Sequence, residues 1–251
     1  MATRTERLAE LRPYIERAST FSGWDHGGLD IRALGAAVPW DYEATAREAV
    51  GNASYVIDLG TGGGERFSTI AAGGTARFVA TEEWAVNSRV ADKRLRPLGI
   101  PLVWCESMRL PFAEASFDLV LSRHEAIDPI EVDRILMPAG CVVTQQITPD
   151  YWGELRNFFP RMTVFPEHDR LYPDGFAARG YEVSMRTHRL HGAFGSLGDL
   201  VFMLLTAPWT IPAFDVERDL DALLAVEAAC RTKDGIVLSE GCYLLVARKP
   251  T

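Results

Sequence analysis

The sequence predicts an α/β fold in which one mostly parallel sheet is covered by helices on both faces. Short apolar runs alternate with helical patterns from residue 55 onward, which is the order typical of such sheets. The first run contains an aspartate, Asp58, and leads into a loop with four glycines among positions 60–64. Hydrophobic residues make up 47% of the chain and charged residues 24%, a balance that supplies a sizeable core.

Two helices and an irregular connection are expected before the sheet begins. Charged and apolar residues alternate at helical spacing over about residues 4–18. The glycine-rich stretch 21–40 is expected to be irregular. A second helix is predicted over about residues 41–50, with Asp41 as its N-cap and Gly51 as its stop.

Seven apolar runs after the second helix predict strands. They span residues 55–60, 76–81, 101–106, 117–122, 141–147, 181–187 and 242–249. More than fifty residues separate the last two runs, and helical patterns cover about 197–205 and 216–231 of them. An insertion of that length is usually a lid or a pocket wall.

We therefore expect a single domain over residues 1–251. Its parts are an N-terminal helical cap (1–50), a ligand-binding core (51–147) and a substrate side (148–251) with a helical insertion at about 192–235.

Composition and charge exclude several classes of protein. The formal net charge of −8 leaves no global positive field to attract phosphates, so nucleic acid is disfavoured as a partner. The four cysteines lie far apart, and the one HxxH pattern, His188 and His191, has no cysteine near it, so no metal site is expected. The sequence carries no signal of oligomeric state.

No membrane or secretory signal is expected either. The N-terminal residues lack a long apolar segment, and the most apolar run, residues 200–209, is interrupted by Pro208. That run is far shorter than the roughly 20 residues of a membrane span. These features favour a cytoplasmic protein without membrane contact.

The glycine loop points to one class of ligand. A dinucleotide fingerprint requires glycine five places after Gly60, where Glu65 stands, and no Gly-Lys-Ser/Thr follows as in a phosphate loop. The pattern D-x-G-x-G-x-G does fit, at Asp58, Gly60, Gly62 and Gly64. In this respect the chain resembles the class I methyltransferases that use S-adenosylmethionine, although a structural turn with incidental glycines remains the alternative.

Three further segments extend this resemblance across about residues 56–147. "FVATEEW" places Glu82 at a strand end 24 residues after Asp58, and "CESMRLPFAEASFDLVLS" and "EVDRILMPAGCVVTQQI" follow in family order, with a turn at 138–140. The resemblance implies a Rossmann-like, doubly wound, seven-stranded sheet whose last strand is antiparallel. It also implies S-adenosylmethionine as cofactor and S-adenosylhomocysteine as product.

The resemblance also assigns a cofactor site residue by residue. Glu82 is expected to accept hydrogen bonds from the ribose hydroxyls, and Trp84 to pack on the adenine. Glu106 is expected to accept from the adenine amine, and the backbone at Ser107 or Met108 to meet a ring nitrogen. The complete set is Asp58, Gly60, Thr61, Gly62, Gly64, Glu82, Glu83, Trp84, Glu106, Ser107, Met108 and Arg123.

The chemistry is expected at the end of the fourth predicted strand, which reads "SRHE". His124 is the candidate general base because the unperturbed pKa of histidine lies near neutrality. Glu125 could orient His124 or contact substrate, and Arg123 could bind an acidic substrate group or the carboxylate of the cofactor. The alternatives are that Arg123 pairs with Glu125 and that His124 is structural.

The acceptor is expected to be a small organic molecule, methylated on O, N or C. Aromatic and apolar residues gather in the two additions to the core, and Trp24, Tyr42 and Trp209 are the predicted acceptor contacts together with His124 and Glu125. Methylation of RNA or protein is the alternative, disfavoured by charge and by the absence of an Asn-Pro-Pro-Tyr-like tetrad. A protein that binds S-adenosylmethionine without turnover is a third possibility.

Overall fold

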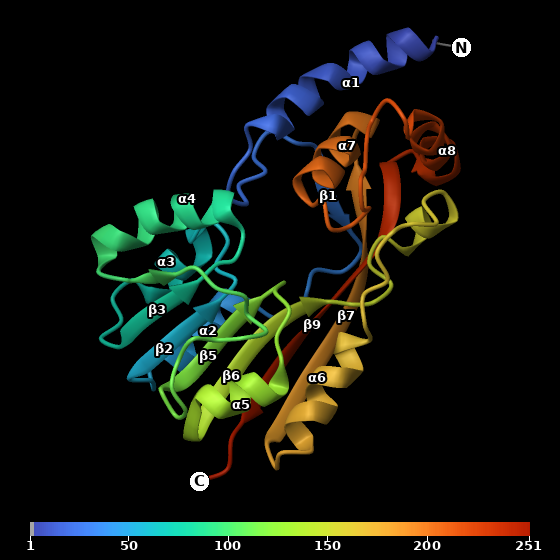
Figure 1. Ribbon diagram of the computed structural model, residues 1–251. Helices are drawn as coiled ribbons and strands as arrows, with labels where there is room; N and C mark the ends of the chain where they lie inside the picture. The colour runs from blue at the N-terminus through green and yellow to red at the C-terminus, as the bar shows by residue number, and fades with distance from the viewer. Residues whose placement is uncertain (1–2) are drawn as a thin grey trace.

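The computed structural model describes residues 3–251, arranged around one sheet (Figure 1). Within these residues the sheet has nine strands in the order β1-β7-β9-β6-β5-β2-β3-β4, with β8 paired to β9. The strands are β1 (Ile31–Leu34), β2 (Tyr55–Leu59), β3 (Arg77–Thr81), β4 (Leu102–Val103), β5 (Phe117–Arg123), β6 (Leu136–Ile147), β7 (Glu182–Phe194), β8 (Arg231–Thr232) and β9 (Gly235–Arg248). Residues 1 and 2 of the expected cap lie outside the described residues.

Eight α-helices and two short 3-10 helices connect the described strands. The α-helices are α1 (Arg4–Ser19), α2 (Tyr42–Val50), α3 (Glu65–Ala71), α4 (Ala85–Leu95), α5 (Pro129–Ile135), α6 (His168–Ala177), α7 (Leu197–Thr206) and α8 (Leu220–Cys230). The 3-10 helices are η1 (Arg96–Leu98) and η2 (Gly153–Asn157). Among residues 3–251 no helix combines the length and apolarity that a membrane span requires.

The strand directions confirm the predicted sheet. Strands β4, β3, β2, β5 and β6 are parallel, whereas β9 is antiparallel to both of its main neighbours, β6 and β7. The seven predicted strands are β2 to β7 and β9. Strands β7 and β9 extend well beyond the predicted runs, and their residues pair continuously from Glu182 with Arg248 to Phe194 with Ile236.

Strand β1 corrects the prediction for residues 21–40, which we expected to be wholly irregular. Its four residues pair antiparallel with the far end of β7, from Ile31 opposite Phe194 to Leu34 opposite His191. So short a strand has little periodicity of its own, and the exposed edge of β7 supplies its hydrogen bonds.

The turn predicted at residues 138–140 lies within the bounds of β6, where Ala139 has a φ of 61°. Helix α5 ends at Ile135, and β6 begins at Leu136 with a register shift between the pairs at Phe117 and Leu119. The amide of Ala139 donates to the carbonyl of Pro250 at 3.0 Å. The expected turn is therefore present as a break in the ladder of β6, between Leu136 and Cys141, and the end of the chain holds it. The N-cap of α2 is confirmed, because the Asp41 side chain accepts from the Ala44 amide.

The two faces of the parallel strands are covered by different helices. Helices α2, α3 and α4 bury Ala46, Phe67 and Leu95 on one face. Helices α5 and α6 bury Val132 and Phe176 on the other. This is the two-sided cover expected of a parallel sheet, whose strands are apolar on both faces.

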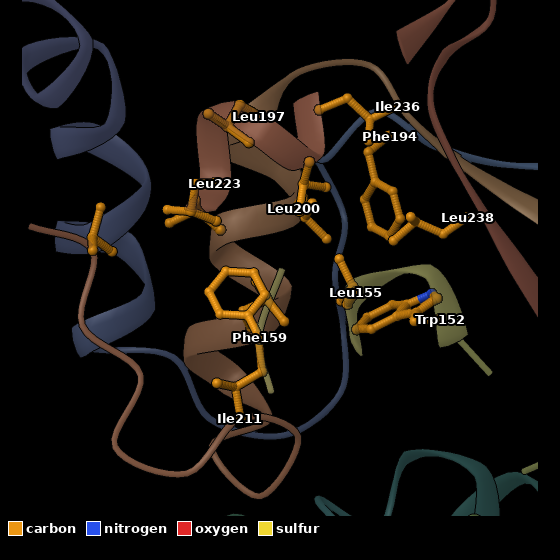
Figure 2. Close-up of a cluster of buried hydrophobic side chains, with 14 of the residues drawn as sticks. Trp152, Leu155, Phe159, Phe194, Leu197, Leu200, Ile211, Leu223, Ile236 and Leu238 are labelled. Carbon is orange, nitrogen blue, oxygen red and sulfur yellow. The ribbon is translucent and has the colours of Figure 1, made fainter. Parts of the chain in front are cut away.

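A third hydrophobic cluster lies at the opposite end of the long strands (Figure 1). We call the part of the chain around it the cap; it consists of α1, β1, η2, α7, α8 and the adjoining ends of β7 and β9. Figure 2 shows Phe194, Leu200 and Leu223 converging there with Trp152 and Phe159. Helix α2 packs on the sheet and not within this cluster. Since β6 leads into η2 and β7 ends in the cluster, the cap covers the carboxyl edge of the parallel strands.

Candidate active site

The loop between β2 and α3 turns sharply on its glycines. Gly60, Gly62 and Gly64 have φ values of 63°, 63° and 77°, in the left-handed region that only glycine adopts at little cost. A Cβ at Gly62 would lie 2.4 Å from the Cδ1 atom of Trp24, and one at Gly60 would lie 2.3 Å from the Cγ atom of Glu125. The loop is therefore lined closely by side chains from the cap side and from the end of β5.

Glu82 ties this loop to the next strand. Its Oε2 atom accepts the Gly62 amide at 2.7 Å, and its Oε1 atom accepts the Trp84 amide at 2.8 Å. Burial raises the pKa of the Glu82 carboxyl, and the two amides oppose that rise. Each carboxylate oxygen has a second acceptor site, so Glu82 can accept hydroxyl groups of a ligand while it holds the loop.

Asp58 lies beneath the same loop and is buried. Burial raises its pKa to about 7, the Thr61 hydroxyl lowers it, and Glu82 raises it further. The Thr61 Oγ1 atom is buried beside this carboxyl. Asp58 and Thr61 therefore support the loop from below.

A hollow of about 480 Å³ opens beside Glu82, between the loops that follow β3 and β4. Trp104 lies on its wall with 71% of its surface exposed, and its indole N–H donates to the carbonyl of Glu83 at 2.7 Å. Glu106 also lines the hollow, whereas Ser107 is buried and Met108 is exposed. The lining residues are Glu83, Trp84, Trp104, Cys105, Glu106 and Arg109.

Trp104 is the functional candidate that the sequence did not reveal. It stands within the apolar run 101–106, which predicts a strand and gives no sign of an exposed side chain. Strand β4 ends at Val103, which leaves Trp104 in the loop. The one signal that could have indicated it is a tryptophan near the end of a predicted strand.

Three tryptophans from distant segments meet above the glycine loop. The ring centroids of Trp24 and Trp209 are 5.9 Å apart, and those of Trp84 and Trp209 are 5.8 Å apart. We call these three residues the tryptophan cluster. They come from the connection after α1, the connection after α7 and the start of α4, and each is about 40% exposed, at 39%, 43% and 44% for Trp24, Trp209 and Trp84. The cluster joins the cap to the carboxyl edge of β3.

At the end of β5, His124 has a φ of 59°, unusual for a residue with a side chain, and its amide donates to the Gln145 carbonyl at 2.8 Å. The residue is exposed to solvent in part, yet the surrounding chain desolvates its ring. This desolvation, with Arg123 and Arg66, lowers the pKa of His124 well below its usual value. The ring is therefore neutral near pH 7, and the same shift makes it a weaker base than an ordinary histidine.

Arg123 and Glu125 do not pair with each other. Among residues 3–251 neither forms a salt bridge. Burial and then the charge of Glu83 raise the pKa of Glu125 to about 7. Burial and then Arg66 lower the pKa of Arg123 to about 10. The Ser107 hydroxyl lies against Glu125, and Arg123 is left without a charged partner, against the alternative that the two form an ion pair.

The structure brings most of the predicted residues to one edge of the sheet. The predicted cofactor residues follow β2, β3, β4 and β5, and the predicted acceptor residues Trp24, Tyr42 and Trp209 reach this edge from both additions. Within the described residues no three His, Cys, Asp or Glu side chains group as metal ligands would.

A family model described as a methyltransferase domain matches residues 57–143, which run from β2 into β6. Residues 57–143 of this chain therefore form a methyltransferase domain. Members of this family use S-adenosylmethionine as cofactor. The match covers the glycine loop, Glu82 and the hollow beside it, so the family assignment and the geometry identify the same edge of the sheet.

Solved structures share the fold of this methyltransferase. The YcgJ protein from Bacillus subtilis is 15% identical with a TM-score of 0.63, over 84% of this chain and 98% of that one. A putative methyltransferase from Bacillus halodurans is 18% identical with a TM-score of 0.59, over 83% and 99%. The [4+2]-cyclase SpnF is 16% identical with a TM-score of 0.54, over 98% and 94%. No curated protein sequence matches the chain significantly.

The chemical groups around the glycine loop suit an adenosyl cofactor. A carboxylate fixed by two amides, a loop of left-handed glycines and a partly aromatic hollow lie side by side. Acidic groups surround the space at Gly60, which suits a ligand with a cationic sulfonium centre.

Proposed function

We propose that this methyltransferase transfers a methyl group from S-adenosylmethionine to a small organic acceptor. The observation that carries the proposal is the tryptophan cluster, in which two additions to the core close over the glycine loop. A cap that packs its own aromatic side chains at the reactive edge suits a small acceptor, whereas an RNA or protein surface needs open access. The net charge of −8 also disfavours RNA.

In this proposal the cofactor is held along the ends of β2, β3 and β4. Glu82 accepts the ribose hydroxyls, and the glycine loop lets the ligand approach the backbone at Gly60 and Gly62. Trp84 and Trp104 pack against the adenine, and Glu106 accepts from its amine. When bound, the cofactor supplies an electrophilic methyl group on sulfur.

Residues from the two additions, together with His124 after β5, act on the acceptor. Methyl transfer is an in-line displacement, so the main task of the protein is to hold the nucleophile in line and exclude water. Trp24, Trp209 and Tyr42 form the wall that does this. His124 accepts the proton of an acceptor hydroxyl, for which its neutral ring is in the required state near pH 7.

The first test is calorimetric titration with S-adenosylmethionine and S-adenosylhomocysteine, with NAD as control ligand. We expect binding of the two adenosyl ligands alone, weakened by Glu82→Ala and unchanged by Glu114→Ala, which removes an exposed carboxylate from a loop distant from the site. Absence of binding by folded wild-type protein would refute the proposal at its first step.

The second test is a panel of small hydroxyl, amine and thiol acceptors, with S-adenosylhomocysteine release and the mass of the product as readouts. We expect a product heavier by one methylene group, and a rate that His124→Ala lowers by about 10²- to 10⁴-fold. Mass analysis of the product is essential because the related fold of SpnF belongs to a cyclase, and a fold does not determine a reaction. Near-normal turnover by His124→Ala would exclude His124 as the base.

A further inference from the structure

Arg123 is a cation without a counterion in a half-buried position. It is the last residue of β5, opposite Gln145 of β6, and it forms no salt bridge within residues 3–251. The nearby cation Arg66 is paired to Glu43 at 2.6 Å, so it does not compete for a ligand. A partly desolvated charge that lacks a partner is costly, so Arg123 requires an anion that the chain does not supply.

Tyr42 provides a second, independent observation. Its side chain is 6% exposed, and its buried hydroxyl makes no hydrogen bond with the described residues. The hydroxyl lies near Asp58 and Arg123, and the backbone amide of Ser122 approaches its oxygen, which leaves the O–H itself as a donor. Burial raises the pKa of this phenol well above its usual value, so it keeps its proton and is a donor. An unsatisfied donor beside an unpaired guanidinium is the complement of an acidic ligand.

The neighbouring carboxyl groups do not fill this role. Glu240 accepts hydrogen bonds from the Tyr151 hydroxyl at 3.2 Å and the Trp152 indole at 3.0 Å. Burial raises the pKa of Asp58 to about 7, and no salt bridge joins it or Glu240 to Arg123. The donors of Arg123 and Tyr42 therefore remain available.

The position of these donors relates them to the reaction. Leu119 and Leu121 of β5 pack on the face that α2 covers, and by strand alternation Arg123 lies on that same face, which is also the face of Tyr42. His124 follows directly in the chain. The pair thus stands at the carboxyl edge, where Tyr42 is also part of the proposed acceptor wall.

We propose that Arg123 and Tyr42 form a carboxylate-binding subsite beside the position of methyl transfer. The guanidinium offers two parallel N–H donors to the two oxygens of a carboxylate, and the phenol adds a third donor. The inference rests on the proposed function, because a carboxylate at this place comes either from the methionyl part of the cofactor or from an acidic acceptor.

Calorimetry with three probes distinguishes the two sources. S-adenosylhomocysteine carries the methionyl carboxylate, 5′-methylthioadenosine lacks it, and benzoate represents an acidic acceptor in protein saturated with S-adenosylhomocysteine. If the carboxylate belongs to the cofactor, Arg123→Gln weakens S-adenosylhomocysteine binding by about tenfold to a hundredfold and leaves 5′-methylthioadenosine binding within about twofold. If it belongs to the acceptor, the same variant weakens benzoate binding by that factor and leaves both adenosyl ligands unchanged.

Two further variants complete the design. Tyr42→Phe removes only the hydroxyl and is expected to weaken the same probe by about twofold to tenfold. Arg248→Gln removes an exposed arginine near the opposite end of the sheet and is expected to change no probe. Urea unfolding checks the fold: Arg123→Gln removes an unpaired charge, so its midpoint should equal or exceed that of wild type.

Equal affinities of wild type and Arg123→Gln for both S-adenosylhomocysteine and benzoate would overturn the subsite and leave the proposed function intact. If the wild-type protein bound no adenosyl ligand, the proposed function would fail, and benzoate titration of the protein alone would still decide the subsite. Loss of benzoate binding in Arg123→Gln would then support it, and absence of benzoate binding in wild type would refute it.

Discussion

Replacing Gly62 by alanine tests the glycine loop and its contact with the cap in one experiment. The φ of 63° is unfavourable for a residue with a side chain, which costs roughly 1–2 kcal/mol. The added Cβ would also lie 2.4 Å from Trp24, whose ring must then shift. Since Trp24 packs against Trp209, and an aromatic pair contributes about 0.5–1.5 kcal/mol, the shift adds about 1–2 kcal/mol with the loss of burial.

Gly99 provides the matched control. Its φ is 73°, and a Cβ there would meet no atom within 4 Å. Gly99→Ala should therefore lower the free energy of unfolding by about 1–2 kcal/mol, and Gly62→Ala by about 2–4 kcal/mol. Urea unfolding measures both values. The same displacement should weaken S-adenosylhomocysteine binding in Gly62→Ala, whereas Gly99→Ala should bind normally.

A double-mutant cycle identifies the cause of the difference. In a Trp24→Ala background, Gly62→Ala should cost no more than Gly99→Ala, because the ring that it displaces is gone. Equal destabilisation of the two single variants in the wild-type background would show that Trp24 does not press on the loop. The account of the tryptophan cluster as a cover over Gly62 would then be wrong.

Three further predictions concern the same edge. Glu82→Gln keeps the shape of the side chain but removes its charge, so S-adenosylhomocysteine affinity by calorimetry should fall about tenfold to a hundredfold; unchanged affinity would exclude the ribose role. Burial raises the pKa of Asp58 from 3.8 to about 7, so the folded state binds this proton more tightly than the unfolded state. That stabilisation is complete below about pH 4 and is lost as the pH rises through about 7, so Asp58→Asn should gain up to about 4 kcal/mol over wild type between these values in urea unfolding. A pH-independent difference would contradict the shift. Trp24→Ala and Trp209→Ala should couple by about 0.5–1.5 kcal/mol in unfolding free energy, and strict additivity would show that the two rings do not interact.

The sequence by itself determined the parallel core and the cofactor edge. Glycines at 60, 62 and 64 are needed for positive φ values, and that need is local, so it is visible in the pattern. The position of Glu82 follows from strand order, because the second strand of a parallel sheet ends beside the first. The N-terminal capping of helix α2 by Asp41 is likewise a contact between residues three apart.

Only the tertiary structure decided which distant side chains meet at that edge. Strand β1 exists because the far half of β7 offers an edge to pair with, and nothing in residues 31–34 encodes that partner. Trp104 lines the hollow beside Glu82 because β4 stops at Val103, a boundary set by pairing with β3. The tryptophan cluster and the unpaired Arg123 depend on where the cap and the sheet place side chains up to 185 positions apart, as for Trp24 and Trp209. Such contacts follow from the packing of whole elements, whereas a sequence pattern reports only the preferences of neighbouring residues.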